Sequence, residues 1–392
     1  MLAALFLCVP AVTSQAVDFQ IKGQWNMGFG LADTKFTSYI RNGSGTKIKS
    51  NNNDRFAARQ RLLLQLDAVA SESLSGTVMF HIGPQKWGFG PQGGAMGADG
   101  VFVKVRQAYI DWKVPDTTIQ TRMGIQNFAM PYAAGGSAVF DLRGASINSH
   151  VDFNENIGLT AMWFRPYNDN YTGSNDTDGT NGYLNNNDNA GYLDNMDLFA
   201  LMLPVNYGGV SVTPWAMYGF VGRDSFENAG ASGDQKKLLQ GLLPLGVSNK
   251  TLTGNSLTDR HGDAWWAGFT TELKVLDPFR FALDATYGRV DLGEGLSTKG
   301  KKIDVKREGW IVSALAEYKM ESVTPGLTAW YSSGDDANVN NGSERLPTIN
   351  PDVKVTSYGF DGTNFCRAQQ VLGTSVDGTF GIVAHLKDIS FF

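Results

Sequence analysis

The chain has 392 residues, of which 42% are hydrophobic, and a formal net charge of −5 at pH 7. The mild acidity and the lack of a dominant basic stripe argue against a nucleic-acid binder. No stretch after the N-terminus approaches the ~20 apolar residues of a membrane-spanning helix, so composition excludes a helical membrane protein. A transmembrane β-barrel is still permitted, because half of its strand residues face water.

Residues 1–16 have the features of an export signal. Leu2 to Val12 form an apolar core, and Ser14 and Ala16 place small residues at the two positions that signal peptidase reads. The basic segment that normally precedes such a core is missing, so we expect the true start to lie upstream of Met1. Cleavage would leave Cys366 as the only cysteine, which excludes an internal disulfide bond.

A period-two pattern then runs through the chain. Apolar residues and glycines occupy the odd positions from Phe19 to Leu31, and polar residues occupy the even positions from Gln20 to Asn26. This alternation indicates a strand with one apolar and one polar face. The same pattern predicts fourteen strands, at residues 19–31, 55–69, 74–82, 101–113, 117–126, 144–153, 157–166, 196–205, 209–221, 263–276, 279–290, 308–320, 326–333 and 376–387.

Short and long connections alternate between these strands. The short ones are rich in Pro, Gly, Asn, Asp and Ser, which favour tight turns. The long ones are predicted at 32–54, 83–100, 127–143, 167–195, 222–262, 291–307 and 334–375. This rhythm is typical of outer-membrane barrels, whereas a soluble all-β array gives no reason to place every long loop at one end.

Two segments depart from the regular pattern, and the strand count is incomplete. Residues 101–113 change phase near Gln107, and 196–205 are apolar on both faces, which predicts a bulge or a wall buried by protein. Single-chain bacterial barrels close with an even number of strands and no free edge. The alternation fails at Asp388 and Ser390, counted back from Phe392, so we expect C-terminal strands to be missing.

The order and spacing of several segments resemble a known family. Val105–Asp111, Arg122–Phe128 and Phe140–Arg143 look like general Gram-negative porins around their third loop. From residue 17 onward, and including Gly381–Ser390, the chain more closely resembles the outer-membrane homotrimeric porins of sulfate-reducing, Desulfovibrio-type bacteria. The resemblance implies a sixteen-stranded barrel, of which about fourteen strands are present here, a homotrimer, and a third loop folded into the lumen.

Face parity predicts which charges line the lumen. Strand 55–69 points Arg55, Arg59, Arg61, Gln65 and Asp67 inward, and other inward sets contain Lys22 and Arg122. By the resemblance, loop 127–143 narrows the channel, and it carries two charges.

We therefore predict a constriction lined by Lys22, Arg59, Arg61, Arg122, Asp141 and Arg143, with the arginines opposite Asp141. Opposed charges across a water-filled gap orient dipolar solutes and set ion preference, which here would be weakly anionic. The alternative is that the arginines pair with Asp67, Asp141 or Asp152 and brace the loop.

Other motifs are weak. Gly88–Gly93 matches G-x-G-x-x-G but lies in an outer loop, with proline after the second glycine. Asp176–Gly179 resembles part of a calcium loop without the distal glutamate, and the four histidines have no metal-ligand spacing. We therefore expect no metal, no cofactor and no catalytic residue.

The sequence thus predicts an all-β, transmembrane, antiparallel up-and-down barrel at residues 17–392. It would form a water-filled channel for passive diffusion of small hydrophilic solutes and ions, in contact with the lipid and lipopolysaccharide of a Gram-negative outer membrane. The alternatives are a substrate-specific sugar or organic-anion channel, a barrel with an enzymatic or surface-structural role, and a soluble β-sandwich lectin or hydrolase.

Overall fold

The computed structural model describes residues 17–32, 39–41, 47–49, 55–97, 103–168, 195–222, 238, 241–244, 261–296, 302–336, 338, 340–349 and 378–390. The predicted export signal, Cys366 and the segment Asp176–Gly179 lie outside these residues.

One antiparallel sheet dominates the described chain, and its strands follow one another in sequence order. Along this path lie β1 (Asp18–Ala32), β4 (Arg55–Ser71), β5 (Leu74–Lys86), β6 (Val103–Lys113), β7 (Gln120–Ala129), β8 (Asp141–Asp152), β9 (Gly158–Asn168), β10 (Asn195–Met202), β12 (Val210–Val221), β13 (Gly262–Leu273), β14 (Phe279–Leu296), β15 (Lys302–Tyr318), β16 (Thr324–Ser332) and β17 (Phe380–Lys387). β11 (Val205–Tyr207) pairs with β12, β2 (Tyr39–Arg41) pairs with β3 (Lys47–Lys49), and Gly90–Gln92 form a single 3-10 turn, η2. The fourteen predicted strands and their up-and-down order are confirmed.

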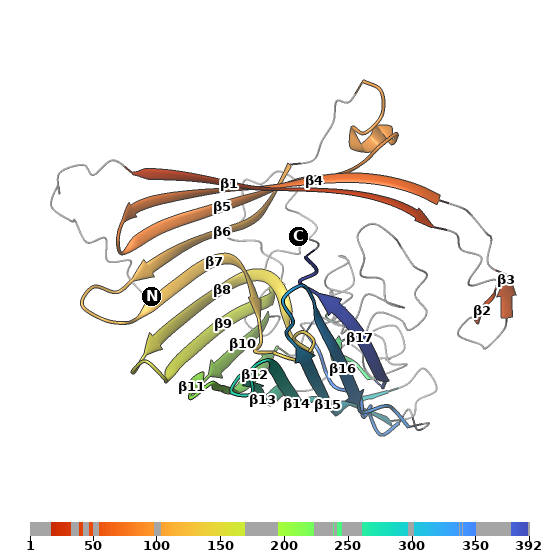
Figure 1. Ribbon diagram of the computed structural model, residues 1–392. Coiled ribbons are helices and arrows are strands. Elements are labelled where there is room, and N and C mark those ends of the chain that lie inside the picture. The colour runs from red at the N-terminus through yellow and green to blue at the C-terminus, as the bar shows by residue number, and fades with distance from the viewer. Residues whose placement is uncertain are drawn as a thin grey trace, which may run out of the picture.

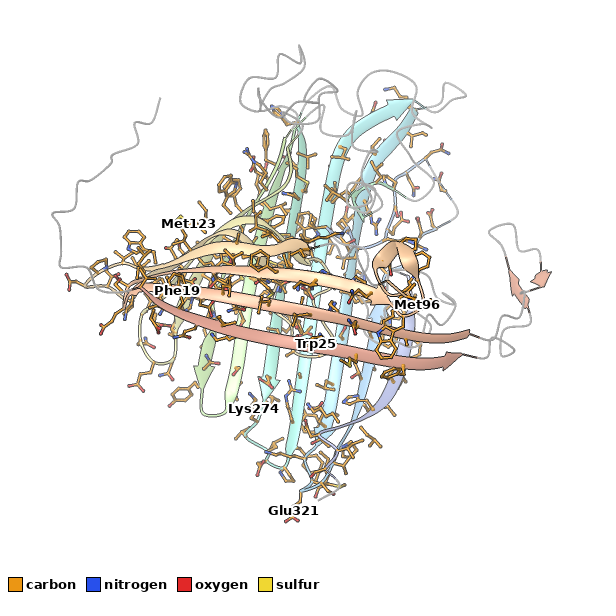
Figure 2. The ribbon with its side chains drawn as sticks, turned by 90° about the horizontal axis from the view of Figure 1, so that it is seen from above. Phe19, Trp25, Met96, Met123, Lys274 and Glu321 are labelled. Atoms are coloured by element: carbon orange, nitrogen blue, oxygen red, sulfur yellow. The ribbon has the colours of Figure 1, made fainter. Side chains whose placement is uncertain are left out.

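The sheet is curved and strongly twisted (Figure 1), and we call its concave side the hollow. Figure 2 shows β1 and β4, near Trp25, crossing at a steep angle the strands that end near Lys274. Such crossing follows from the right-handed twist of neighbouring strands, which accumulates along a sheet. β1 and β17 are its two edges and are not paired with each other in the described residues, so the sheet is not closed there. In the same part of the chain, no helix is long and apolar enough to cross a membrane.

The predicted loop lengths need two corrections. The ladder of β14 and β15 continues through Glu294–Asp304 to Leu296–Lys302, so residues predicted as loop 291–307 mostly form an extended hairpin. β7 and β8 pair as far as Ala129–Asp141, which shortens the predicted loop 127–143 to residues 130–140. In both places, cross-strand hydrogen bonds extend the strands beyond the segment where side-chain alternation reveals them.

Both predicted irregularities are confirmed. The β5–β6 register shifts between Met79 and Phe80, which leaves Arg106 as an extra residue beside Gln107. The β9–β10 register shifts at Asp197. The other apolar face of β10 is buried, since Met196 and Leu198 have no exposed surface. An extra residue in one strand re-aims the neighbouring side chains, which explains the change of phase.

Candidate functional site

The connection between β7 and β8 turns into the hollow of the sheet (Figure 1). Its tip reaches β14, where the Asp284 carboxylate accepts hydrogen bonds from the backbone N–H groups of Ala133 (2.9 and 3.0 Å) and Ala134 (2.7 Å). The Thr270 hydroxyl donates to the same carboxylate at 2.5 Å. Residues 130–140, hereafter the inward loop, therefore span the hollow between two distant parts of the wall.

Apolar contacts support both the tip and the base of the inward loop. At the tip, Ala134 is 1% exposed and packs with Ala282 and Leu315 on the wall. At the base, Phe140 is fully buried, with its ring centroid 4.6 Å from that of Phe164 on β9. The inward loop contains no charged residue. The carboxylate that binds its backbone, Asp284, belongs to strand β14 of the sheet.

Cationic side chains gather on the wall formed by β4, β5, β6 and β8. His81 interacts electrostatically with four cationic side chains, those of Arg61, Lys104, Arg106 and Arg143. The Nη1 atom of Arg106 lies 3.4 Å from His81 Nδ1. Arg61 lies on the same face of the sheet as Lys22. It is opposite Asn26 in the β1–β4 ladder, and Asn26 is an even number of positions from Lys22 on β1. Arg59 falls on that face too, by alternation along β4. We call the group Arg59, Arg61, His81, Lys104, Arg106 and Arg143 the basic cluster.

The acidic residue predicted to face this cluster lies beside it. Asp141 and Arg143 are not loop residues, because β8 begins at Asp141 and pairs with β7 from there. Asp141 attracts Arg143 electrostatically, and Arg143 is also close enough to Arg61 for their like charges to repel. The carboxylate on the far side of the hollow is instead that of Asp284 on β14, at the tip of the inward loop.

Lys22 forms an ion pair on the inner wall. Its Nζ lies 2.9 Å from Asp67 Oδ2, and Thr77 and Gln65 donate to the same carboxylate at 2.7 and 2.8 Å. The Lys22 side chain remains 62% exposed while the Asp67 side chain is 11% exposed. The amine therefore keeps contact with the solvent of the hollow, and the carboxylate is fixed by three partners.

Arg122 lies apart from the basic cluster. Its guanidinium binds Asp111 through two hydrogen bonds of 2.6 and 2.9 Å and lies 4.1 Å from the ring centroid of Tyr109. Arg122 and Asp111 border an open pocket of about 710 Å³ near the short turns, which Gln126 and Asn148 also line. The pairing partly follows the bracing alternative, although Asp111 was not among the carboxylates predicted for it.

A second charged network was missed by the sequence reasoning. Glu317, whose side chain is 4% exposed, contacts Arg280 Nη1 (2.8 Å), Lys387 Nζ (2.7 Å) and His385 Nε2 (3.1 Å). Arg280 also pairs with Glu272. Alternation along single strands places Glu272, His385 and Lys387 on polar faces, but only pairing across β13, β14, β15 and β17 brings the five residues together.

The outer face carries two rows of aromatic residues, an upper row on β12–β16, nearer the long connections, and a lower row on β14 and β15, nearer the short turns. The upper row contains Tyr218, Trp265, Tyr287, Trp310 and Tyr331, with ring contacts at 5.1 Å (Trp265–Tyr287) and 5.3 Å (Trp310–Tyr331). The lower row contains Phe279, Phe281 and Tyr318, with Phe279 and Tyr318 4.9 Å apart.

Between the two rows the outer face is apolar. Trp310 and Tyr318 are eight positions apart on β15, which is roughly 26 Å along a strand. Val312, Ala314 and Ala316 occupy the outward positions between them. At the upper row, the Tyr218 hydroxyl donates to Asp263 at 2.6 Å and the Tyr287 hydroxyl bonds to Glu308, so the polar ends of these rings point away from the apolar band.

The weak motifs gain little from the structure. Gly88–Gly93 follows β5, but the next element is the 3-10 turn η2 and not the α-helix that a dinucleotide site requires. Among the described residues, the carboxylates of Asp335, Asp336 and Glu344 lie within 4.8 Å of one another, which is close enough to hold a cation. This group is in the connection after β16 and apart from the inner-wall groups described above.

Comparisons with known proteins identify remote structural likeness only. No protein-family model matches the chain, and no curated protein sequence matches it. Among solved structures, OmpF of Salmonella typhi in complex with daunomycin is 11% identical with a TM-score of 0.40, covering 83% of this chain and 82% of that chain. The outer membrane channel DcaP of Acinetobacter baumannii is 12% identical with a TM-score of 0.40, covering 81% and 79%. The outer membrane protein OmpT of Vibrio cholerae, in its trimer form, is 12% identical with a TM-score of 0.32, covering 84% and 93%. These values assign neither a family nor a function.

Proposed function

We propose that the protein is an outer-membrane porin, a water-filled channel through which small hydrophilic solutes and ions diffuse passively. The observation that carries this proposal is the outer face of β14 and β15, where an apolar band lies between two aromatic rows. With strands tilted by ~40°, the step of eight positions from Trp310 to Tyr318 rises roughly 20 Å, close to the ~25 Å apolar band of transmembrane barrels. A soluble sandwich would bury such a face.

The exposed apolar surface extends over the other strands. Phe19 and Ile21 on β1 are each 70% exposed, and Ile382 and Leu386 on β17 are 58% and 62% exposed. Soluble monomers rarely expose contiguous apolar patches larger than a few hundred square ångströms. Lipid is the environment in which such a face costs no free energy.

The inner face supports a channel with a narrowed section. The inward loop crosses the hollow to Asp284, and the basic cluster lies on the wall formed by β4, β5, β6 and β8. The cationic side chains on one side and the Asp284 carboxylate on the other create a transverse field. Because the cationic side has more charges close together, the channel prefers anions weakly. Lys22, Arg59, Arg61, Arg122, Asp141 and Arg143 are retained as pore-lining residues of this proposal.

The same proposal places the protein as a homotrimer in the outer membrane of a Gram-negative bacterium, among lipid and lipopolysaccharide, as the sequence resemblance implies. It assigns no catalysis. Trp266, which would favour a sugar channel if it lined an open lumen, is 1% exposed and donates to Pro347 O at 2.8 Å. The specific-channel alternative therefore gains no support from this residue.

The deciding experiment is planar-bilayer recording of the refolded protein under a salt gradient. Ohmic current steps in multiples of three, with a finite reversal potential toward anions, are the expected result. Silence from protein shown to be folded and inserted would overturn the channel and favour the enzymatic or surface-structural alternatives.

A further inference from the structure

Three chain segments meet inside the hollow against β9–β16. They are the inward loop, residues 241–244 and residues 343–349, and we call them together the inner plug. Backbone hydrogen bonds join them: the Thr348 N–H donates to Gly241 O at 2.9 Å, and the Ile349 N–H donates to Val139 O at 2.9 Å. Segments that are distant in sequence thus form one hydrogen-bonded body.

Apolar side chains attach this body to the wall. Leu242 and Leu346 have no exposed surface and Ile349 is 2% exposed, and all three belong to a cluster with Trp215 and Trp266 of β12 and β13. At ~25 cal/mol per Å² of buried apolar area, such packing stabilises the inward position of the segments. The inner face of β9–β15 is therefore covered by protein and is not a water-filled wall.

A single buried arginine fixes two of the segments. Arg307 on β15 is 4% exposed. Its Nη2 and Nε donate to Leu346 O at 2.8 and 3.1 Å, and its Nη1 donates to Leu243 O at 3.3 Å. A guanidinium in apolar surroundings is costly unless its N–H groups are satisfied, and its planar fork can reach two carbonyls at once.

Two glycines show how closely the plug fits. A Cβ at Gly309, two residues from Arg307 on β15, would lie 2.4 Å from Glu344 O. A Cβ at Gly241 would lie 2.0 Å from Thr348 O. Neither position accepts a side chain without moving the backbone, so the close approach of these segments requires glycine.

We propose that Arg307 is a positioning residue that seats the inner plug on the β9–β15 wall, so that the permeation path is confined to the space between the plug and the polar wall of β1 and β4–β8. The proposal rests on the channel function stated above. In this proposal, residues 241–244 and 343–349 narrow the channel at a second place, in addition to the inward loop. Confinement to one side of the hollow brings solutes against Lys22 and the basic cluster.

Two independent variants test this proposal. Arg307→Met removes the guanidinium donors, and Gly241→Ala disturbs the plug without changing the barrel wall or any charge. Lys302→Gln is the control, since it removes an exposed charge of the same strand that pairs with Glu294. We expect roughly a two-fold rise in single-channel conductance for both variants, because pore width governs conduction, with wild-type conductance in the control.

A second readout does not depend on conduction. Hydrogen–deuterium exchange of the 343–349 segment in detergent micelles should be slow in the wild type and the control, and faster in both variants, because the Thr348 and Ile349 amides lose their acceptors. If Arg307→Met fails to fold, Gly241→Ala decides. Wild-type exchange and wild-type conductance in Gly241→Ala would overturn the plug. Silence of the folded wild-type protein would instead overturn the channel itself, whatever the exchange rates.

Discussion

Asp284→Ala should release the inward loop from the wall. The Asp284 carboxylate accepts hydrogen bonds from the backbone N–H groups of Ala133 and Ala134. Alanine removes the acceptor and leaves the outward-facing neighbours of β14 unchanged, so the expected effect is local to the loop.

The magnitude follows from the number of bonds. A hydrogen bond to a charged group contributes about 1.5–3 kcal/mol, and we use the low end of this range. Two such bonds give about 3 kcal/mol, which changes the ratio of seated to released loop by roughly two orders of magnitude. The remaining contact of Ala134 with Ala282 and Leu315 is small, so it does not replace the lost bonds.

Single-channel recording is the assay. We expect larger or flickering conductance levels in Asp284→Ala, and faster hydrogen exchange over residues 130–140. Asp111→Ala is the matched control, since Asp111 is also an inner-wall carboxylate but binds Arg122 and not the loop. Current traces of Asp284→Ala that match the wild type in level and noise would refute the role given to this carboxylate.

Three further outcomes test other parts of the structure. The double variant Arg59→Glu, Arg61→Glu should move the reversal potential under a KCl gradient toward cations, and an unchanged potential would remove these residues from the selective section. Glu317→Ala leaves Arg280, Lys387 and His385 without their buried carboxylate, so thermal unfolding in detergent should show a loss of about 3 kcal/mol, whereas an unshifted midpoint contradicts the network. Ala314→Arg, in the middle of the apolar band, should cost about 2–4 kcal/mol in bilayer folding titrations relative to Ala314→Leu, and equal stability of the two would mean that this face does not contact lipid.

Much of the fold was predictable because its signal is local. Side chains alternate with a period of two along each strand, so the run from Phe19 to Leu31 defines both the strand and its outward face without knowledge of the rest of the chain. The change of phase near Gln107 likewise revealed a bulge at Arg106. Turn residues placed the short connections for the same reason, since their backbone preferences act over three or four residues.

The channel lining could be predicted only in part. Face parity assigned Arg59, Arg61, Lys22 and Arg122 to one side of the sheet, and the ladders agree. Face parity does not determine which charged groups form pairs. Arg122 forms an ion pair with Asp111, and Asp141 lies beside Arg143 instead of opposite to it. Pairing of side chains depends on the register of several strands, which no single segment contains.

The tertiary structure alone decided what fills the hollow. Asp284 accepts hydrogen bonds from Ala133, a residue 151 positions earlier in the chain, and Arg307 binds two segments that no periodic pattern connects. The apolar inner face of β10, with Met196 and Leu198, was visible in the sequence as an anomaly, but its cover was not. The sequence by itself determined where the strands run and which face is apolar, since both depend on neighbouring residues. Burial of an inner face, in contrast, depends on which distant segments fold against it.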